Sequence, residues 1–399
     1  MPDENSADAF DVVIAGGAVM GSSIAYHLAK LGEGRLSILV VEQDPSYQRS
    51  ASALSAGSIR QQFSTAINID ISLHGIAFLR DIDRHLGLDG EKVDISLKEG
   101  GYLYLATGEG APLLGEINAL QNARGADILL HDRADLNSRF PWLAAGDLAA
   151  GSWGRTGEGW FDGYGLMQAF RRKARALGVA YRQGKVADVQ RAGNRIRSVI
   201  LADGSRIACG ALVNTCGASG ARSLSTAMGF PIPVFAKKRS VFSFACPTDL
   251  PGFPLLIDTS GVWVRPEGRD FIAGYSPDDG DEVEHPADFE VDWPLFEDYI
   301  WPALAARVPA FEQLRPGRAW AGHYDMCLID HNALVGRLPD LANGYLAAGF
   351  SGHGLQQSPA VGRGIAELIL HGEYRSLDLA PLGCHRLASG EPLLERNVI

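Results

Sequence analysis

Residues 10–42 decide the fold: residues 10–15 read FDVVIA, residues 16–21 read GGAVMG, and residues 36–42 read LSILVVE. The first run is apolar and rich in β-branched residues, which is typical of a buried strand, and it stops at two adjacent glycines. A helical pattern follows, and the second apolar run ends at Glu42. Strand, glycine turn, helix and second strand in this order predict a βαβ unit that binds a dinucleotide.

Each small residue of this unit has a mechanical role. Gly16 and Gly17 permit a tight turn off the strand, and Gly21 lets the helix pack closely on the sheet. The helix N-terminus offers N–H groups to a pyrophosphate, and Glu42 is expected to accept hydrogen bonds from a ribose. Ala18 occupies the position of the middle glycine of G-x-G-x-x-G. Its methyl group is the smallest side chain that could limit how closely the backbone approaches the phosphate. The alternative is a structural βα turn that binds no nucleotide.

The composition favours a globular enzyme that acts on a small molecule. The chain of 399 residues is long enough for two domains, and its 47 glycines suit a backbone that approaches a large cofactor repeatedly. A net charge of −11 without a basic run argues against a nucleic-acid partner.

The five cysteines are scattered and form no C-x-x-C pair, so the sequence predicts neither a disulfide framework nor a metal site. From this distribution of cysteines we infer that the protein works in a reducing compartment. The first nine residues are acidic and polar, unlike a targeting peptide, and no apolar run is long enough to span a membrane. We therefore expect a soluble, cytoplasmic protein.

Later segments predict a return to the first sheet and a second sheet. Residues 211–219 form a buried strand ending in small residues, which we place beside the first strand. Residues 231–311 alternate apolar and polar and predict an antiparallel sheet, while residues 142–163 predict a loop or edge strand. Residues 344–354 predict a strand that runs into a second glycine turn. Helices are expected at residues 69–86, 113–123, 166–177 and 358–370.

Glycine turns near both ends of the chain fit a flavin better than a nicotinamide, which needs only one such turn in contiguous βαβ units. Residues 16–21 would hold the pyrophosphate, and residues 349–354 would present a helix N-terminus to the flavin ring. The alternatives are a plain strand-to-helix turn at residues 349–354 and an NAD-linked dehydrogenase, which would be colourless when purified.

The predicted fold class is α/β, in an α+β two-domain arrangement: a Rossmann-like FAD-binding domain with an inserted antiparallel-sheet substrate domain. The FAD-binding domain is expected to be discontinuous, with residues 8–85, 160–225 and 325–385. Residues 86–159 and 226–324 are expected to form the substrate-binding domain.

Three segments carry a family resemblance: residues 11–23 (DVVIAGGAVMGSS), residues 58–63 (SIRQQF) and residues 349–359 (GFSGHGLQQSP). Together they resemble the D-amino-acid-oxidase-type flavoproteins, which include sarcosine oxidase, glycine oxidase and dimethylglycine dehydrogenase. Within that family, residues 320–326 (WAGHYDM) and 378–381 (DLAP) are most similar to FAD-dependent oxidoreductase-domain proteins related to a mitochondrial complex I assembly factor. The resemblance implies FAD and oxidation of a C–N bond in an amino acid or N-substituted glycine.

The chain departs from these relatives at four functional positions. Gly322 stands where sarcosine oxidases attach FAD through a cysteine, and Leu54 where dimethylglycine dehydrogenases use a histidine, so we expect non-covalent FAD. Ile272 and Gln356 replace the two lysines that activate oxygen and bind the substrate carboxylate in sarcosine oxidase. The resemblance therefore does not imply that this chain reacts fast with oxygen, or that it binds the substrate carboxylate through the lysine used in sarcosine oxidase.

The residues expected to contact the cofactor come from both glycine turns and from the segments that the resemblance places beside them. They are Gly16, Ala18, Val19, Met20, Gly21, Glu42, Gln43, Ser50, Ser52, Ser55, Ala56, Gly57, Val186, Cys216, Gly217, Ala218, Gly322, Gly349, Phe350, Ser351, Gly352, His353, Gly354, Leu355 and Gln356.

The candidate catalytic residues are Arg60, His323, Tyr324, His353 and Gln356. Arg60 would bind the substrate carboxylate or the flavin edge, with a surface salt bridge as the alternative. His323 and Tyr324 would hydrogen-bond the substrate, although His323 is as readily a structural histidine. His353 and Gln356 would lie at the flavin or substrate.

We therefore predict an FAD-dependent amine or amino-acid oxidase or dehydrogenase. Its substrate would be a small secondary amine, such as an N-substituted glycine, or a cyclic or D-amino acid. Hydride transfer to flavin would give an imine that hydrolyses, and oxygen or a redox carrier would accept the electrons. The alternative that the resemblance suggests is a flavoprotein that acts mainly by binding a protein partner.

Overall fold

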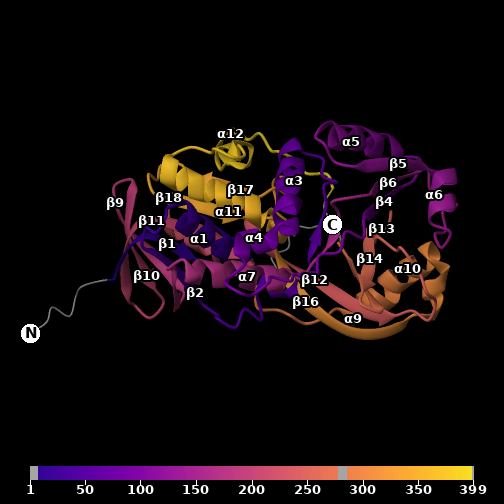
Figure 1. Cartoon of the computed structure of the whole chain (residues 1–399), viewed down its shortest axis with the longest axis horizontal. Helices are drawn as coiled ribbons and strands as arrows, with labels where there is room; N and C mark the ends of the chain where they lie inside the picture. Colours follow the sequence, from indigo (N-terminus) through magenta and orange to yellow (C-terminus); the bar gives the residue numbers. More distant parts are fainter. Residues whose placement is uncertain (1–7, 277–284, 398–399) are drawn as a thin grey trace, which may run out of the picture.

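The computed structural model describes residues 8–276 and 285–397, whose strands form two eight-stranded sheets and one short ribbon. Figure 1 shows the first sheet in the left half of the molecule and the second in the right half, with the chain passing back and forth between them. The ribbon pairs β3 (Ser58–Ile59) with β7 (Gly159–Trp160).

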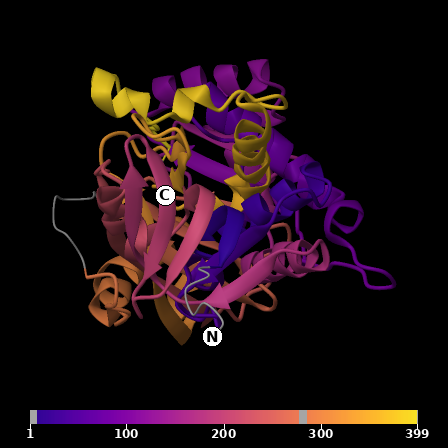
Figure 2. The ribbon, with the colours of Figure 1, turned by 90° about the vertical axis from the view of Figure 1, so that its left-hand side faces the viewer.

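The first sheet has the order β17-β18-β11-β1-β2-β8, and a hairpin of β9 and β10 extends from β11. Figure 2 looks onto this end of the molecule. The strands are β1 (Ala9–Ala15), β2 (Ile38–Glu42), β8 (Ala180–Gln183), β9 (Val186–Ala192), β10 (Arg195–Leu201), β11 (Arg206–Asn214), β17 (Leu334–Arg337) and β18 (Gly344–Ala348).

Strand β1 lies in the middle of this sheet and pairs in parallel with both β11 and β2. Val12 and Ile14 belong to the hydrophobic core on one face, and Val13 and Ala15 belong to the core on the other. A strand buried on both faces explains the continuous apolar run in its sequence. The predicted βαβ unit and the predicted strand beside β1 are both confirmed.

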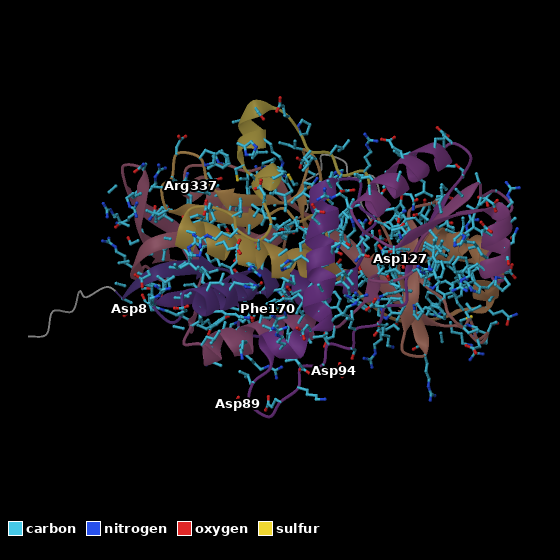
Figure 3. The ribbon with its side chains drawn as sticks, turned by 45° about the horizontal axis from the view of Figure 1, so that its top comes forward. Asp8, Asp89, Asp94, Asp127, Phe170 and Arg337 are labelled. Atoms are coloured by element: carbon cyan, nitrogen blue, oxygen red, sulfur yellow. The ribbon has the colours of Figure 1, made fainter. Side chains whose placement is uncertain are left out.

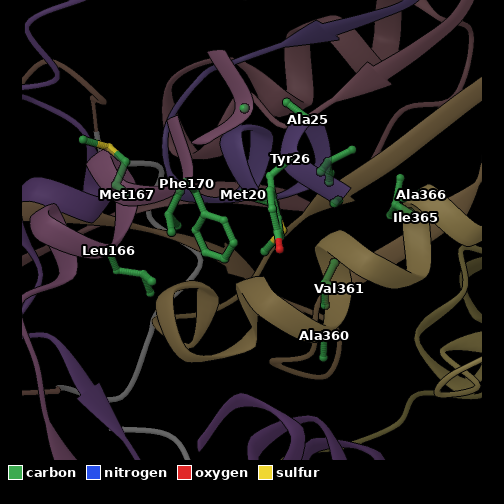
Figure 4. Packing of buried hydrophobic residues seen from close by; sticks show 14 of the residues in the cluster. Met20, Ala25, Tyr26, Leu166, Met167, Phe170, Ala360, Val361, Ile365 and Ala366 are labelled. Atoms are coloured by element: carbon green, nitrogen blue, oxygen red, sulfur yellow. The ribbon is translucent and has the colours of Figure 1, made fainter. Parts of the chain in front are cut away.

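Helices cover both faces of the first sheet. They are α1 (Val19–Leu31), α2 (Ala51–Leu54), α3 (Ala66–Arg80), α4 (Ile82–Leu86), α7 (Gly163–Ala176), α8 (Gly217–Ala227), α11 (Gly354–His371) and α12 (His385–Ser389), with a 3₁₀ turn, η3 (Ala380–Leu382). Tyr26 of α1, Phe170 of α7 and Val361 of α11 point toward one another in the core (Figure 4). Phe170 lies inside the molecule, whereas Asp89 and Asp94 lie on an outlying loop (Figure 3).

The second sheet has the order β16-β12-β15-β14-β13-β4-β6-β5. Its neighbouring strands are antiparallel except β13 and β4, which run parallel. The strands are β4 (Tyr102–Ala106), β5 (Ile128–Asp132), β6 (Ala150–Gly154), β12 (Val234–Ala245), β13 (Leu255–Ile257), β14 (Val262–Glu267), β15 (Asp270–Tyr275) and β16 (Arg315–Cys327). The helical segments beside it are α5 (Ala111–Ala123), α6 (Arg133–Arg139), α9 (Trp293–Leu295), η1 (Phe296–Ile300), α10 (Trp301–Arg307) and η2 (Pro309–Gln313).

The predicted sheet at residues 231–311 is wrong in its last part. Strands end at Tyr275, residues 277–284 lie outside the described residues, and residues 293–313 are helical. Phe296, Ile300 and Leu304 recur every four residues and are buried, which is a helical period. In the sequence, the prolines of this stretch suggest breaks between strands. They lie instead in the first turns of α9, α10 and η2, where the N–H that proline lacks would have no partner within the helix.

The stretch at residues 142–163 is mostly loop, as predicted, but its longer strand is not an edge strand. Its strand β6 pairs with β4 on one side and β5 on the other, so β5 is the edge. Gly151 makes this position possible, because a side chain there would lie 2.7 Å from the Leu136 side chain.

The domain boundaries stay a prediction. The order of the strands along the chain is discontinuous in the same way as the predicted domains. The chain leaves the first sheet to form β4 to β6, returns, and leaves it again to form β12 to β16. Strand β16 runs to Cys327 and so continues past the predicted boundary at residues 324/325. Across the two described stretches, no helix has both the length and the hydropathy that a bilayer crossing requires.

Candidate functional site

The first glycine turn connects β1 to α1 and leaves no room for side chains. Gly16 has a φ of +95°, and a Cβ there would lie 2.5 Å from the Thr215 carbonyl oxygen. A Cβ on Gly21 would lie 1.9 Å from the Gly16 carbonyl oxygen. Thr215 closes the turn, because its hydroxyl donates to the Gly16 carbonyl at 2.8 Å. Both glycines are thus required by the close approach of strand and helix.

Glu42 lies at the end of β2, beside this turn. Its carboxylate accepts hydrogen bonds from the backbone N–H groups of Gly17 (2.7 Å) and Asp44 (2.8 Å). Burial raises the pKa of Glu42, and these two N–H groups oppose the shift. The carboxylate also faces a cavity, where it can accept hydrogen bonds from hydroxyl groups.

Two adjoining cavities start from this turn. The first, of about 360 Å³, extends past Glu42 along the carboxyl ends of the first sheet, and the second, of about 120 Å³, lies between α1 and the second sheet. Ala18, Ala51, Thr215, Gly217 and His323 line both. The two cavities therefore form one elongated space that joins the first sheet to the second.

Most of the residues predicted to bind cofactor or substrate line this space. The first cavity is lined by Gly16, Ala18, Glu42, Gln43, Ser50, Val186, Cys216, Gly217, Ala218 and His323. The second is lined by Ala18, Val19, Met20, Ser52, Ser55, Ala56, Gly217, Gly322, His323, Tyr324, Phe350, Gly352, Gly354 and Leu355.

Seven predicted residues lie outside both cavities: Gly21, Gly57, Arg60, Gly349, Ser351, His353 and Gln356. The glycines among them lie behind the residues that line the cavities, where close packing leaves no room for a side chain. Gly57, for example, has a φ of +62°, and a Cβ there would lie 2.2 Å from the Phe161 carbonyl oxygen.

The second glycine turn follows β18 and is held by the last part of β16. The Asp325 carboxylate accepts a hydrogen bond from the Gly349 N–H at 2.7 Å. Burial raises the pKa of Asp325 to about 6, although backbone N–H donors oppose the shift. Gly352 has a φ of +91°, and a Cβ there would lie 2.6 Å from the Tyr324 ring. The turn and Tyr324 thus form one wall of the second cavity.

Arg60, His353 and Gln356 form a buried cluster directly behind this wall. An Arg60 guanidinium nitrogen lies 3.0 Å from His353 Nε2, and the Arg60 N–H donates to the Gln356 side-chain oxygen at 2.8 Å. The guanidinium also donates to the carbonyl oxygens of Gln62 and Asn397 and lies 4.0 Å from the Phe63 ring centroid. Arg60 is therefore buried and bonded to protein groups rather than aimed into the cavity.

The carboxylate of Glu158 fixes the chain that follows Arg60. It accepts hydrogen bonds from the Gln61 N–H and the Gln62 N–H, and from the Gln62 side-chain amide at 2.8 Å. Burial raises the pKa of Glu158 to about 7, and these hydrogen bonds and Arg60 oppose the shift.

Sequence reasoning missed Arg239, a charged residue that lines the second cavity. Arg239 lies on β12, is 8 % exposed, and donates to the Lys238 carbonyl at 3.0 Å. Its guanidinium carbon is 5.5 Å from the Tyr324 ring centroid. A signal for this role was available, because residues two apart in a strand point to the same face. Arg239 therefore shares a face with Val241, which is buried. Trp263 of β14 was also missed; with Tyr275, it completes an aromatic wall.

Near the first cavity, Phe289 was missed. It contacts the ring of His323 edge-on at 4.8 Å, and the Arg49 guanidinium lies 5.4 Å from its ring centroid. All five cysteines fall within the described residues and are free thiols. Burial, with Glu42 nearby, raises the pKa of the Cys216 thiol to about 12, so this cavity-lining thiol stays protonated near neutral pH.

Comparisons with known proteins agree on one family. A family model described as FAD dependent oxidoreductase matches residues 11–368. The FAD-dependent oxidoreductase domain-containing protein 1 of Xenopus laevis is 43% identical, over 98% of this chain and 85% of that protein.

Solved structures agree as well. The L-proline dehydrogenase of P. horikoshii is similar with a TM-score of 0.84 and 26% identity, over 97% of this chain and 100% of that one. The glycine oxidase of Geobacillus kaustophilus has a TM-score of 0.80 and 23% identity, over 94% and 98% of the two chains, and shows the fold alone.

Proposed function

This chain belongs to the family of FAD-dependent oxidoreductases, and on that premise we propose that it oxidises the C–N bond of a small amino acid or secondary amine. The observation that carries the proposal is the second cavity, where a buried guanidinium and three aromatic side chains face the cofactor turns. The named relatives act on L-proline and glycine according to their descriptions, and both fit a cavity of this size.

The residues present fit FAD. Side chains on the glycines of the turn at residues 16–21 would clash with neighbouring protein atoms, so the turn stays tight. The cavity extends from there past Glu42 in one direction and to the second turn in the other. We propose non-covalent binding, because Gly322 and Leu54 occupy the two positions that bear attachment groups in relatives. These two residues lie side by side, since a Cβ on Gly322 would be 2.9 Å from Leu54 Cβ.

The protein's own residues bind and orient the substrate. When bound, FAD supplies the acceptor for a hydride from the substrate α-carbon, and water then hydrolyses the resulting imine. Arg239 would pair with the substrate carboxylate, because a guanidinium binds a carboxylate in a bidentate manner and this one lines the cavity. Trp263, Tyr275 and Tyr324 would exclude water and fix the amine carbon in one orientation.

The test is anaerobic bleaching of the flavin absorbance by N-methyl, N-carboxymethyl, cyclic and D-amino acids, each paired with the amine that lacks the carboxylate. We expect at least one acid to bleach the flavin and its decarboxylated partner to be weaker. In Arg239→Met the acid should lose about 2 kcal/mol of transition-state binding, or about 30-fold in kcat/KM.

Arg318→Met, at an exposed position on β16, is the control and should leave kcat/KM unchanged. Equal bleaching by acid and amine in the native protein would contradict the role of Arg239. If no compound in the panel bleaches the flavin, the oxidase proposal fails, and binding to a protein partner becomes the function to pursue.

For the electron acceptor we propose a redox carrier rather than oxygen. Ile272 stands where a lysine activates oxygen in sarcosine oxidase, and it packs in the apolar cluster with Val241 and Trp263. The reduced protein should reoxidise slowly in air and quickly with an artificial carrier dye in stopped-flow measurements. Reoxidation by air as fast as turnover would contradict this.

A further inference from the structure

Residues 393–397 form a segment that crosses the molecule next to the cluster of Arg60 and His353; we call it the strap. Its backbone is anchored at the turn that follows β16. The Leu393 N–H donates to the Asp330 carboxylate at 3.0 Å, and the Glu395 N–H donates to the Asp330 carbonyl at 3.0 Å. Asp330 is itself fixed by a buried ion pair with Arg386 at 2.7 Å. The strap therefore has a firm attachment to the first half of the molecule.

Glu395 is the centre of the strap. It is 1 % exposed, and its carboxylate accepts hydrogen bonds from the Ser64 N–H and hydroxyl, both at 2.7 Å. The other carboxylate oxygen accepts from the Thr65 hydroxyl and the Asn68 amide, both at 3.0 Å. These donors lie just before and within the first turn of α3, so one buried carboxylate is bonded to the N-terminal end of a fifteen-residue helix.

The strap then reaches the cluster behind the second glycine turn. The carbonyl of Asn397 accepts a hydrogen bond from the Arg60 guanidinium, and its side-chain amide donates to the Gln62 carbonyl at 3.2 Å. The same Arg60 nitrogen lies 3.0 Å from His353. Contacts thus run without a gap from Glu395 through Arg60 to His353, which stands between two glycines that line the cavity.

We propose that Glu395 is a positioning residue for the cofactor site: it holds the strap on α3, and the strap fixes Arg60 and, through it, the turn of residues 349–354. The Glu395 carboxylate receives five hydrogen bonds away from water, the four above and one from the Asn397 N–H at 3.1 Å. It is therefore a rigid attachment, and its loss leaves several buried donors unsatisfied. The inference depends on FAD binding and is independent of which amine is oxidised.

The first test compares Glu395→Ala with Glu391→Ala, an exposed glutamate four residues earlier in the chain. FAD is removed and the apo-proteins are titrated with FAD, with flavin fluorescence as the readout. We expect Glu395→Ala to weaken FAD binding about tenfold, which corresponds to the loss of one charged hydrogen-bonded contact. Glu391→Ala should bind FAD like the native protein.

Hydrogen exchange on the same apo-proteins separates positioning from local stability. Glu395→Ala should speed exchange at residues 64–68 and also at residues 351–356, where Arg60 contacts His353. Faster exchange confined to residues 64–68, with native FAD affinity, would overturn the proposal. Neither readout requires turnover, so a failure here is distinct from a failure to find the amine.

A double-mutant cycle tests the route through Arg60. Glu395→Gln keeps the size and one acceptor oxygen and serves where the alanine variant does not fold. If the strap acts through the guanidinium, the FAD dissociation constants of Glu395→Gln and Arg60→Met should combine to less than the product of the separate fold-changes. Independent, multiplicative effects would show that Glu395 does not act through Arg60.

Discussion

Single small residues set the geometry of the site. Gly21 touches the Gly16 carbonyl so closely that even a methyl group would force the helix away from the strand. The sequence motif predicted this role, because the same contact requires glycine wherever a helix starts on a strand of this kind. The motif also predicted Glu42, whose carboxylate lines the first cavity.

We expect Gly21→Ala to destabilise the protein by about 1–3 kcal/mol through overpacking and to lower FAD content. Gly115→Ala is a matched control, since Gly115 also lies inside a helix but its Cβ would meet only Leu130 at an ordinary 3.9 Å. That change should stabilise the protein by up to about 1 kcal/mol. Urea denaturation and the ratio of flavin to protein absorbance measure both. Equal effects of the two substitutions would contradict the contact at Gly16.

Buried histidines in the first half make the fold sensitive to acid. The Nε2 atom of His27 has no hydrogen-bond partner among the described protein atoms, and burial holds the pKa of His27 well below its usual range. Lys30, Arg363, His74 and His85 face it from α1, α11, α3 and α4 and add to the lowering. The unfolded chain therefore binds a proton that the folded chain does not, so stability falls as the pH drops below about 6.5.

His27→Phe should flatten that loss. The ring lies among Tyr26, Phe78 and Phe170, where another aromatic side chain fits. Between pH 8 and pH 5.5, the native protein should lose up to about 1.4 kcal/mol more per pH unit below 6.5 than the variant. Urea midpoints at the two pH values measure the difference. An unchanged pH dependence in His27→Phe would show that other groups account for the acid sensitivity.

Arg60 shows where residue-level reading stops. The sequence predicted that its side chain binds the substrate carboxylate or the flavin edge. In the structure the side chain contacts His353 and donates hydrogen bonds to backbone carbonyls. Two of these partners, His353 and Asn397, lie about three hundred residues away in the chain, and no local pattern encodes such a distance. Arg239 was missed for a related reason: its strand pattern gave a signal, but the pairing of β12 with β16 that sets it opposite Gly322 is also non-local.

At the scale of elements, the contact between α1 and α11 joins the two glycine turns. Each turn leads into one of these helices, so their separation sets the distance between the turns. Gly362 of α11 faces Ser23 of α1, and the Ser23 hydroxyl donates to the Ser358 carbonyl at 2.7 Å. A Cβ on Gly362 would lie 2.1 Å from that hydroxyl oxygen.

Gly362→Ala should therefore push the helices apart, cost about 1–3 kcal/mol, and weaken FAD binding. Adding Ser23→Ala removes the clashing hydroxyl, so the double variant should recover part of both losses relative to Gly362→Ala alone. Thermal melting and FAD titration measure them. Additive losses in the double variant would show that the helices do not meet through these two residues.

Elements with a clear period were predictable, and the errors came from ambiguous ones. The helical stretch of residues 293–307 contains two Trp-Pro pairs, at 293–294 and 301–302, which also suit the ends of short strands. Its apolar residues recur every four positions only over a short length. Helix α11 starts at Gly354, four residues before the predicted start at Ser358, and its first residue, glycine, is a poor helix former.

At the scale of the whole molecule, the cofactor space draws its walls from both sheets. The first cavity includes Phe289 from the second half, and the second cavity includes Val19 and Met20 from the first. Binding of FAD should therefore couple the stability of the two halves.

We expect FAD at 100 times its dissociation constant to add about 2.7 kcal/mol of stability to the apo-protein. Because both halves contact the space, differential scanning calorimetry should show the whole unfolding transition moving to higher temperature. A second transition that ignores FAD would contradict the coupling.

The position of β1 has a consequence for how the protein is made. This strand leaves the ribosome before the other strands of its sheet, yet it lies in the middle of that sheet, and its partner β11 follows nearly two hundred residues later. The turn of residues 349–354 and helix α11 follow later still. Flavin capture is thereby postponed until residues 349–371 have been translated, and a nascent chain stalled before that point is expected to be colourless, prone to aggregation and dependent on chaperones.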